Sequence, residues 1–251
     1  MANEELFTNR AENYQKSRPG YAEGVIGLLL GEILKPDGRI ADIGSGTGLF
    51  AKPLIEHGFS VYCVEPNAKM REQAVREFAG NPHFISIAAV AEATTLEEHS
   101  MDIVAAASAL HWFEMENFQR ECKRILKPEG IFFAVINCRN YADPFTLRQH
   151  KLCQRLCPDF TSLSHGLEKT IPRLEILLGK AYQSQRFDFP LTYTKEAFIQ
   201  RSLSSSYAPE PDSPEEREYI KALRQLMEEF FPHTDRITLP NQSAAFWGRP
   251  I

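Results

Sequence analysis

The residues best suited to chemistry form a glycine-rich segment near the start of the chain, Ala41-Asp42-Ile43-Gly44-Ser45-Gly46-Thr47-Gly48. This segment follows a short apolar run and precedes residues with helical spacing, which predicts a loop between a strand and a helix. Glycines allow such a loop to turn tightly and to approach a ligand closely, and the helix start offers unpaired N–H groups. The segment therefore indicates a small-molecule binding site.

The spacing within this loop separates it from two nucleotide-binding loops. A dinucleotide-binding loop requires a third glycine at position 49, which is Leu49 here, and the Gly-Lys-Ser/Thr of a P-loop is absent. Asp42 would oppose a pyrophosphate and suits a ligand that carries positive charge. Glu65 follows Gly44 by 21 residues, the approximate spacing at which an acidic residue accepts hydrogen bonds from ribose hydroxyls. The combination favours a cationic nucleoside over a nicotinamide cofactor.

An α/β core is expected to position these residues. Strand-like and helix-like segments alternate from residue 39 to residue 137, which predicts parallel strands with helices on both faces of the sheet. We expect strands at 39–43, 60–64, 83–90, 101–107 and 131–137, and helices at 48–57, 68–78 and 116–126. Because Pro53 lies inside the first of these helices, we expect a kink near Leu49 or a helix that starts late.

The pattern changes after residue 140. Helical spacing recurs at 144–156, 171–181, 195–204 and 214–231, and strand-like alternation at 183–189 and 236–249. The five cysteines are odd in number and scattered, which indicates reduced thiols and no metal site. The formal net charge of −5 disfavours a broad nucleic-acid-binding surface.

No apolar run reaches membrane-spanning length, and the polar N-terminus does not have the pattern of a secretory signal. We therefore expect a cytoplasmic protein, monomeric or homodimeric, whose partners include neither a membrane nor a nucleic acid.

Several motifs together resemble those of class I S-adenosylmethionine (SAM)-dependent methyltransferases, in the branch of trans-aconitate-methyltransferase-like proteins with a methyltransferase type 11 domain. Beside the glycine loop, the resemblance rests on Val64-Glu65-Pro66-Asn67, Met70, Ala91-Glu92-Ala93-Thr94, Ala107-Ser108-Ala109-Leu110-His111-Trp112-Phe113 and the upstream Tyr14-Gln15-Lys16-Ser17-Arg18-Pro19-Gly20-Tyr21. These motifs span residues 14 to 137, about half of the chain. They are specific for the superfamily and carry little information on the substrate.

The resemblance implies a Rossmann-like α/β fold, with a seven-strand mixed sheet that is mostly parallel, an antiparallel last strand, flanking helices and a helical lid. It also implies one domain over residues 1–251. Its core would be 36–140, its lid 141–180 together with 1–24, and its C-terminal strands and helices 181–251.

The resemblance further implies that SAM is the cofactor and S-adenosylhomocysteine the product. The glycine loop would line the methionine and ribose, Glu65 would hold the ribose hydroxyls, and Met70 would pack on the adenine. Many relatives have an Asp just before Ala91, where this chain has Val90. The cofactor-binding residues expected on this basis are Tyr14, Arg18, Asp42, Gly44, Ser45, Gly46, Gly48, Glu65, Pro66, Met70, Ala91, Glu92 and Ser108.

Methyl transfer is an in-line displacement at carbon, so the protein mainly has to align the acceptor with the methyl group. A general base is needed only if the acceptor carries a proton when it attacks, and His111 is the candidate for that role. The other interpretation is that His111 packs at the start of the next helix. Trp112, Tyr141 and Arg139 are candidate substrate residues, since an arginine can clamp a carboxylate bidentately.

The sequence thus predicts methyl transfer to a small-molecule acceptor, with O-methylation of a carboxylate or hydroxyl favoured. A non-catalytic SAM-binding protein and a nicotinamide-dependent oxidoreductase are the alternatives.

Overall fold

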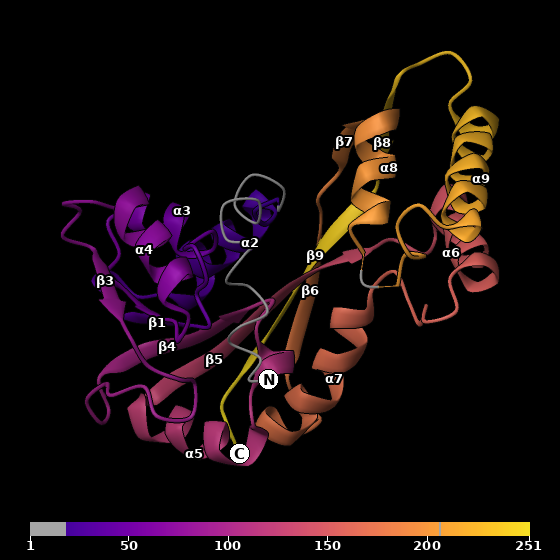
Figure 1. Ribbon diagram of the computed structural model, residues 1–251. Coiled ribbons are helices and arrows are strands. Elements are labelled where there is room, and N and C mark those ends of the chain that lie inside the picture. The colour runs from indigo at the N-terminus through magenta and orange to yellow at the C-terminus, as the bar shows by residue number, and fades with distance from the viewer. Residues whose placement is uncertain (1–18, 206) are drawn as a thin grey trace. The chain divides into compact units, whose positions relative to one another are not determined.

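The computed structural model describes residues 19–205 and 207–251 (Figure 1). The chain divides into two compact units. Unit 1 comprises the chain up to Asn137, Gly166–Phe187 and Ser243–Ile251, and unit 2 comprises Cys138–His165 and Asp188–Gln242. Each unit has its own buried apolar residues.

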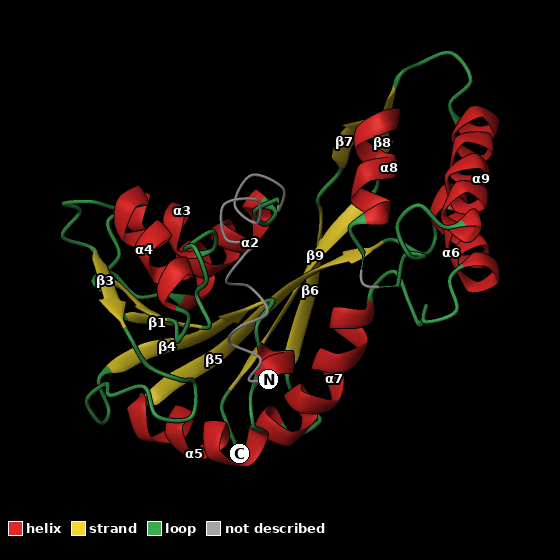
Figure 2. Ribbon diagram, in the orientation of Figure 1, coloured by secondary structure: helices red, strands yellow, loops and turns green. Residues whose placement is uncertain are grey.

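Unit 1 contains most of a seven-stranded mixed sheet in the order β3-β2-β1-β4-β5-β9-β6 (Figure 2). Five strands are parallel: β1 (Ile40–Ile43), β2 (Val61–Val64), β3 (Phe84–Ile87), β4 (Met101–Ala107) and β5 (Leu126–Arg139). The sheet is completed by β6 (Gln183–Asp188) and by β9 (Asn241–Gly248), the antiparallel last strand. The seven-strand Rossmann-like fold expected from the sequence is therefore confirmed.

The order of the parallel strands reverses between β1 and β4, since β2 and β3 lie on one side of β1 while β4 and β5 lie on the other. In open α/β sheets, ligands bind outside the carboxyl ends of the strands at such a switch point. All four residues of β1 are buried, as expected for a strand covered on both faces. The glycine loop leaves β1 directly at this switch point.

Helices cover both faces of the sheet. α2 (Glu23–Leu28), α3 (Ala51–Glu56) and α4 (Ala68–Glu77) lie on one face, and α5 (Met115–Ile125) and α7 (His165–Leu178) lie on the other (Figure 2). α3 begins late, at Ala51, one of the two outcomes expected from Pro53. Proline is tolerated there because the N–H groups of a first helical turn have no intrahelical partner.

One helical segment of unit 1, α2 with its continuation, was not expected from the sequence, and two further elements differ from their expected boundaries. A π-helical turn, η2 (Leu29–Ile33), continues α2. α7 begins earlier than residue 171 and contains Pro172. β5 begins at Leu126, the last residue of the helix expected at 116–126 and five residues before the strand expected at 131–137, and its register with β4 shifts between Met101 and Ile103.

Unit 2 combines three helices with a two-stranded antiparallel sheet. The helices are α6 (Pro144–Leu156), α8 (Lys195–Leu203) and α9 (Pro214–Phe230), and the strands are β7 (Leu191–Thr194) and β8 (Arg236–Leu239). Asp143 and Ser213 cap α6 and α9, each followed by a proline in the first helical turn, the position at which proline is best tolerated. The sequence did not predict β7, which is only four residues long.

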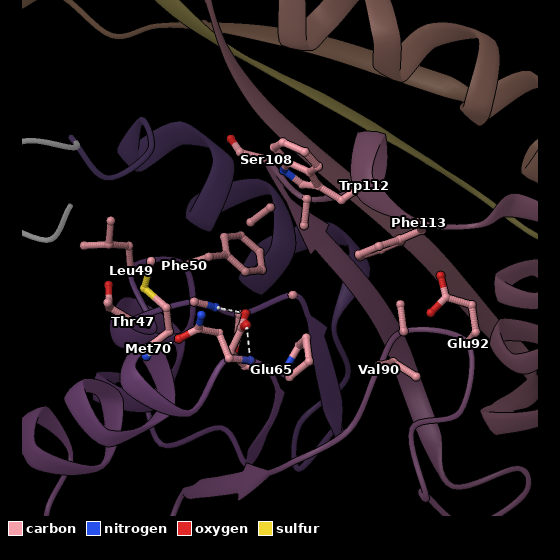
Figure 3. A pocket seen from close by; sticks show the side chains of 18 of the residues that line it. Thr47, Leu49, Phe50, Glu65, Met70, Val90, Glu92, Ser108, Trp112 and Phe113 are labelled. Carbon is pink, nitrogen blue, oxygen red and sulfur yellow. Dashed lines mark hydrogen bonds between the residues drawn. The ribbon is translucent and has the colours of Figure 1, made fainter. Parts of the chain in front are cut away.

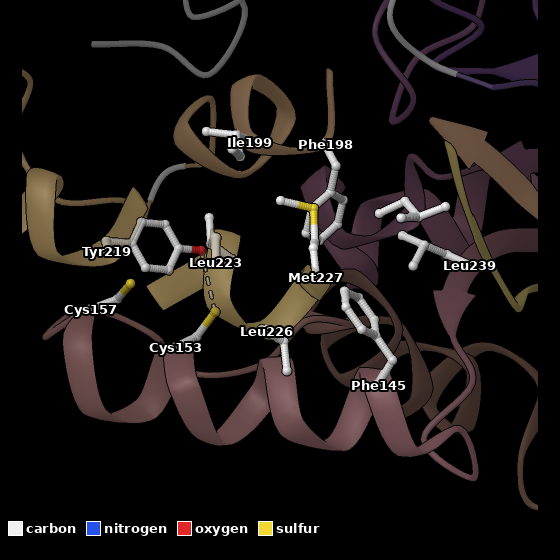
Figure 4. Close-up of a cluster of buried hydrophobic side chains, with 11 residues drawn as sticks. Phe145, Cys153, Cys157, Phe198, Ile199, Tyr219, Leu223, Leu226, Met227 and Leu239 are labelled. Carbon is white, nitrogen blue, oxygen red and sulfur yellow. Dashed lines mark hydrogen bonds between the residues drawn. The ribbon is translucent and has the colours of Figure 1, made fainter. Parts of the chain in front are cut away.

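The core of unit 2 is a cluster of aromatic and aliphatic side chains around Tyr219 (Figure 4). Cys153 and Cys157 lie one turn apart and are both buried, and the hydroxyl of Tyr219 lies 3.4 Å from Cys153 Sγ. Within the described ranges, no three His, Cys, Asp or Glu side chains are grouped to hold a metal ion. None of the described helices is both long enough and apolar enough to cross a membrane.

Candidate functional site

A cavity of about 350 Å³ lies at the switch point, beside the loops that follow β1, β2 and β4 (Figure 3). Its volume lies within the range of small-molecule binding sites. All of its lining residues belong to unit 1. They are Tyr21, Gly44, Ser45, Gly46, Thr47, Leu49, Phe50, Glu65, Pro66, Asn67, Met70, Val90, Ala91, Glu92, Ala107, Ser108, Ala109, Trp112 and Phe113.

The glycine loop forms one wall of this cavity. Gly44 has a φ of +69°, a conformation that side chains rarely adopt. A Cβ atom at this position would lie 2.8 Å from the Cβ of Ala109. Gly44 thus brings the loop after β1 close to the segment that follows β4.

Gly44→Ala is expected to lower the free energy of unfolding by roughly 2–4 kcal/mol. The left-handed backbone accounts for about 1–2 kcal/mol, and the contact with Ala109 adds strain. Urea unfolding followed by circular dichroism measures the loss. Gly58→Ala is the matched control, since Gly58 has a φ of +84° and a Cβ added there would meet nothing within 4 Å. Equal losses in the two variants would show that the contact with Ala109 contributes nothing.

Glu65 connects the glycine loop to the end of β2. Its Oε2 accepts the backbone N–H of Gly46 at 2.9 Å, and its Oε1 accepts the backbone N–H of Asn67, also at 2.9 Å (Figure 3). The side chain is 9 % exposed. A carboxylate only accepts hydrogen bonds, and the two backbone N–H groups fix this one at the cavity.

Asp42 lies behind the loop as a buried carboxylate without a hydrogen bond. It is fully buried in β1, between Cys63 of β2 and Ala105 of β4. Neither of its oxygens has a hydrogen-bond partner among the described residues. Burial, and secondarily the negative charge of Glu65, raises the pKa of Asp42 to about 7. Buried charges are normally paired, so this carboxylate is suited to stabilise a cation held in front of it.

The loop after β2 leads into α4 and brings Met70 to the cavity. Asn67 caps α4 by accepting the N–H of Met70 at 3.1 Å, and the Met70 side chain is buried. A flexible thioether of this kind packs well against an aromatic ring. Further along the chain, Val90 and Ala91 line the cavity, while the Glu92 carboxylate accepts the N–H of Glu114 at 2.7 Å.

The loop after β4 begins with a strained residue. Ser108 has a φ of +54° although it is not a glycine. The hydroxyl of Tyr21 donates a hydrogen bond to Ser108 Oγ at 3.1 Å, and the Ser108 N–H donates to the carbonyl of Val135. Strained residues of this kind cluster at ligand-binding sites. Trp112 follows in the short helix η3 (Leu110–Trp112) and is 43 % exposed.

Most of the residues expected to bind the cofactor are gathered at this cavity. Asp42 and Gly48 adjoin the lining residues but are not among them. His111 does not line the cavity either, and its ring centroid lies 5.0 Å from that of Trp112. The residues expected at the site that do line it are Gly44, Ser45, Gly46, Glu65, Pro66, Met70, Ala91, Glu92, Ser108 and Trp112.

The other expected residues lie elsewhere. Arg139 and Tyr141 belong to unit 2. Tyr14 and Arg18 fall outside the described residues.

Sequence reasoning missed part of the lining. Phe50 reads in the sequence as an apolar residue of the first core helix, but it precedes α3, and its ring lies 5.7 Å from that of Tyr21. Leu49 is missed for the same reason. Asn67 and Phe113 belonged to recognised motifs, although no role was assigned to them.

The chain is similar in sequence to known methyltransferases. A sequence family described as "Methyltransferase domain" matches residues 41–134. An uncharacterized methyltransferase-like protein of Schizosaccharomyces pombe is 28% identical over 254 residues, which cover 96% of this chain and 93% of the relative. An uncharacterized methyltransferase of Mycobacterium tuberculosis is 32% identical over 134 residues, but the match covers only 53% of each chain.

Among solved structures, a proposed type II methyltransferase from Anaeromyxobacter dehalogenans has a TM-score of 0.66 at 24% identity. The match covers 92% of this chain and 97% of the other. This likeness concerns the fold.

Proposed function

We propose that this chain, of which residues 41–134 match a methyltransferase domain, is a class I SAM-dependent methyltransferase that transfers a methyl group to an oxygen atom of a small-molecule acceptor. SAM is the methyl donor, and S-adenosylhomocysteine is the product. The observation that carries the proposal is the pairing of two carboxylates at one cavity. Glu65 lines the cavity, and Asp42, which adjoins the lining, is buried in β1 with no hydrogen-bond partner among the described residues.

We assign each carboxylate to one part of the donor. Glu65 is suited to the ribose hydroxyls because it lines the cavity and its carboxylate, a group that only accepts hydrogen bonds, is fixed by two backbone N–H groups. Asp42 is suited to the positive charges of the donor because no group within its own surroundings neutralises it. Met70 would then pack on the adenine, and Tyr21, Ser108 and Trp112 would surround the acceptor.

When bound, SAM supplies a methyl group on a cationic sulfur, which becomes a neutral thioether as the acceptor oxygen bonds to the methyl carbon. The protein contributes alignment, and an effective concentration gain of this type is worth up to about 7–11 kcal/mol. Tyr21 orients the Ser108 hydroxyl, while the rings of Phe50 and Trp112 exclude water from the acceptor.

The lining of the cavity favours an acceptor that is already ionised. Among the described residues that line it there is no histidine, lysine or cysteine, and both glutamates already accept backbone N–H groups. A hydroxyl acceptor would have to lose a proton, whereas a carboxylic acid with a pKa near 4 is ionised at neutral pH. A carboxylate oxygen is therefore the proposed methyl acceptor, with a hydroxyl as the second candidate.

The proposal is tested by methyl transfer from isotope-labelled SAM to panels of small carboxylic acids, phenols and amines. We expect labelled methyl esters from the acids and no product from the amines. Tight SAM binding without transfer to any panel would favour a non-catalytic SAM-binding protein. Binding of NADH in place of SAM would favour the oxidoreductase alternative.

His111 is proposed as the general base for hydroxyl acceptors only. His111→Asn is expected to leave transfer to carboxylates within about threefold of the original rate, since these acceptors carry no proton. Any transfer to phenols should fall by about 100-fold, the usual contribution of a general base. The measurement is kcat for both acceptor panels as a function of pH. Unchanged kcat on phenols would remove His111 from the chemistry.

A further inference from the structure

Two partly exposed arginines of unit 2 have no acidic partner among the described residues. Arg139 ends β5 and Arg201 lies on α8, and both are only partly exposed. Neither forms an ion pair with any residue in the described ranges. By contrast, Arg148, Lys195 and Arg224 of the same unit pair with Glu229, Glu228 and Glu196, respectively.

The Arg139 guanidinium is hydrogen-bonded to a neutral amide and lies near a second cation. Its Nη1 donates to Asn241 Oδ1 at 3.1 Å. The Nδ2 of Asn241 is buried and has no acceptor among the described residues. Burial, and then the positive charge of Arg201, lowers the pKa of Arg139. A buried cation next to a second cation is unfavourable unless an anion compensates it.

Tyrosines surround the two guanidinium groups. The guanidinium carbon of Arg201 lies 5.4 Å from the ring centroid of Tyr193. Tyr193, Tyr207 and Tyr141 all lie close enough to Arg139 to affect its pKa. Tyr141 is held by Ser162 Oγ at 3.0 Å and by the backbone N–H of Leu163 at 3.0 Å. The two guanidinium groups therefore lie beside aromatic rings, and neither pairs with a carboxylate of the described residues.

We propose that Arg139, Arg201 and Asn241 form a binding site for an oxyanion, a carboxylate or phosphate group of a small molecule. The planar fork of a guanidinium binds either group through two parallel hydrogen bonds. The hydrogen bond between Arg139 and Asn241 holds these two donors in place, which reduces the entropy lost on binding. That the bound molecule is the methyl acceptor rests on the proposed function, whereas anion binding by unit 2 does not.

The first experiment measures anion binding by calorimetry and by thermal unfolding of the full chain without SAM. The probes are succinate and inorganic phosphate, with chloride at matched ionic strength. We expect one of the oxyanions to raise the Tm well beyond chloride. Stronger binding of succinate identifies a carboxylate site, and stronger binding of phosphate identifies a phosphate-ester site. No effect beyond chloride would overturn the proposal.

Variants separate a binding role from a structural role. Arg201→Gln should weaken the binding of the oxyanion by about 10- to 100-fold, the usual value of hydrogen bonds to a charged group. Without added anion, its Tm should rise, because the repulsion of Arg139 is removed. Arg201→Lys should retain part of the affinity, since it keeps the charge but loses the fork. Arg155→Gln, on the exposed face of α6, should change neither quantity.

Arg201→Gln also has an outcome that contradicts the proposal. A lower Tm with unchanged oxyanion affinity would make Arg201 structural and would refute the proposal. SAM binding by each variant is measured in parallel and should be unchanged. Loss of methyl transfer with intact oxyanion binding would count against the proposed function alone, whereas methyl transfer without oxyanion binding would count against this site alone. Arg139→Gln provides a second test at the other guanidinium.

Discussion

Replacing Glu65 by glutamine is expected to weaken SAM binding by about 100-fold or more. The carboxylate is held at the cavity by the N–H groups of Gly46 and Asn67, where it would accept hydrogen bonds from the ribose hydroxyls. A hydrogen bond to a charged group contributes about 1.5–3 kcal/mol, and glutamine replaces one acceptor oxygen with a donor. Isothermal calorimetry with SAM and S-adenosylhomocysteine measures the loss.

A comparison of two nucleosides distinguishes a ribose contact from damage to the loop. The original protein should bind adenosine more tightly than 2′-deoxyadenosine, and Glu65→Gln should abolish that preference. The preference for adenosine over 2′-deoxyadenosine is measured in both proteins. As in a double-mutant cycle, the difference between the two values gives the interaction energy between Glu65 and the 2′-hydroxyl. Glu72→Gln on the exposed side of α4 is the matched control and should bind like the original protein. A full 2′-hydroxyl preference in Glu65→Gln would rule out the assigned role.

Asp42→Asn is expected to stabilise the ligand-free protein above about pH 7 and to weaken SAM binding. The folded-state pKa of Asp42 is about 7, against 3.8 for an ordinary aspartate. Between about pH 4 and pH 7 the folded state therefore retains a proton that the unfolded state has lost. The free energy of unfolding falls as pH rises through this window, by at most about 4 kcal/mol, and then levels off. Asparagine does not ionise, so the free energy of unfolding of the variant should depend less on pH.

The measurement is urea unfolding at several pH values between about 4 and 8. Asp102→Asn provides a control for which the expected change in the free energy of unfolding has the opposite sign. Burial alone would raise the pKa of Asp102, but hydrogen bonds from Lys127 and from the N–H of Arg39 outweigh it and lower the pKa. The ionised Asp102 therefore stabilises the fold above its unfolded pKa, and this stability is lost as pH falls through the folded pKa. Asp102→Asn should accordingly be less stable at neutral pH.

The effect of Asp42→Asn on SAM follows from the same charge. An ionised carboxylate close to a cation in a partly desolvated site contributes a few kcal/mol, so we expect SAM affinity to fall by about 10- to 100-fold at pH 8. In the original protein the affinity for SAM should rise as pH increases through about 7. In the variant this rise should be absent. Unchanged SAM affinity and an unchanged pH profile of stability would together contradict the assigned role of Asp42.

The sequence by itself determined the parts of this protein that depend on local spacing. The periodicity of apolar residues predicted the parallel strands and most helices, because a strand or helix that packs on a core must repeat its apolar side chains. The glycine loop and the 21-residue interval from Gly44 to Glu65 predicted a nucleoside site. Both lie within a single strand–helix–strand unit, so chain connectivity alone limits their separation.

Only the tertiary structure decided the features that depend on residues far apart in the chain. Asp42 is buried because β2 and β4 enclose β1, and it has no hydrogen-bond partner in the described part of the chain; no local pattern carries that information. Tyr21 reaches Ser108 across 87 positions, and Arg139 reaches Asn241 across 102. Such contacts arise from strand order and packing, which a single sequence does not reveal. This explains why most residues that line the cavity at the switch point could be named in advance, while the arginine pair of unit 2 could be recognised only in the folded chain.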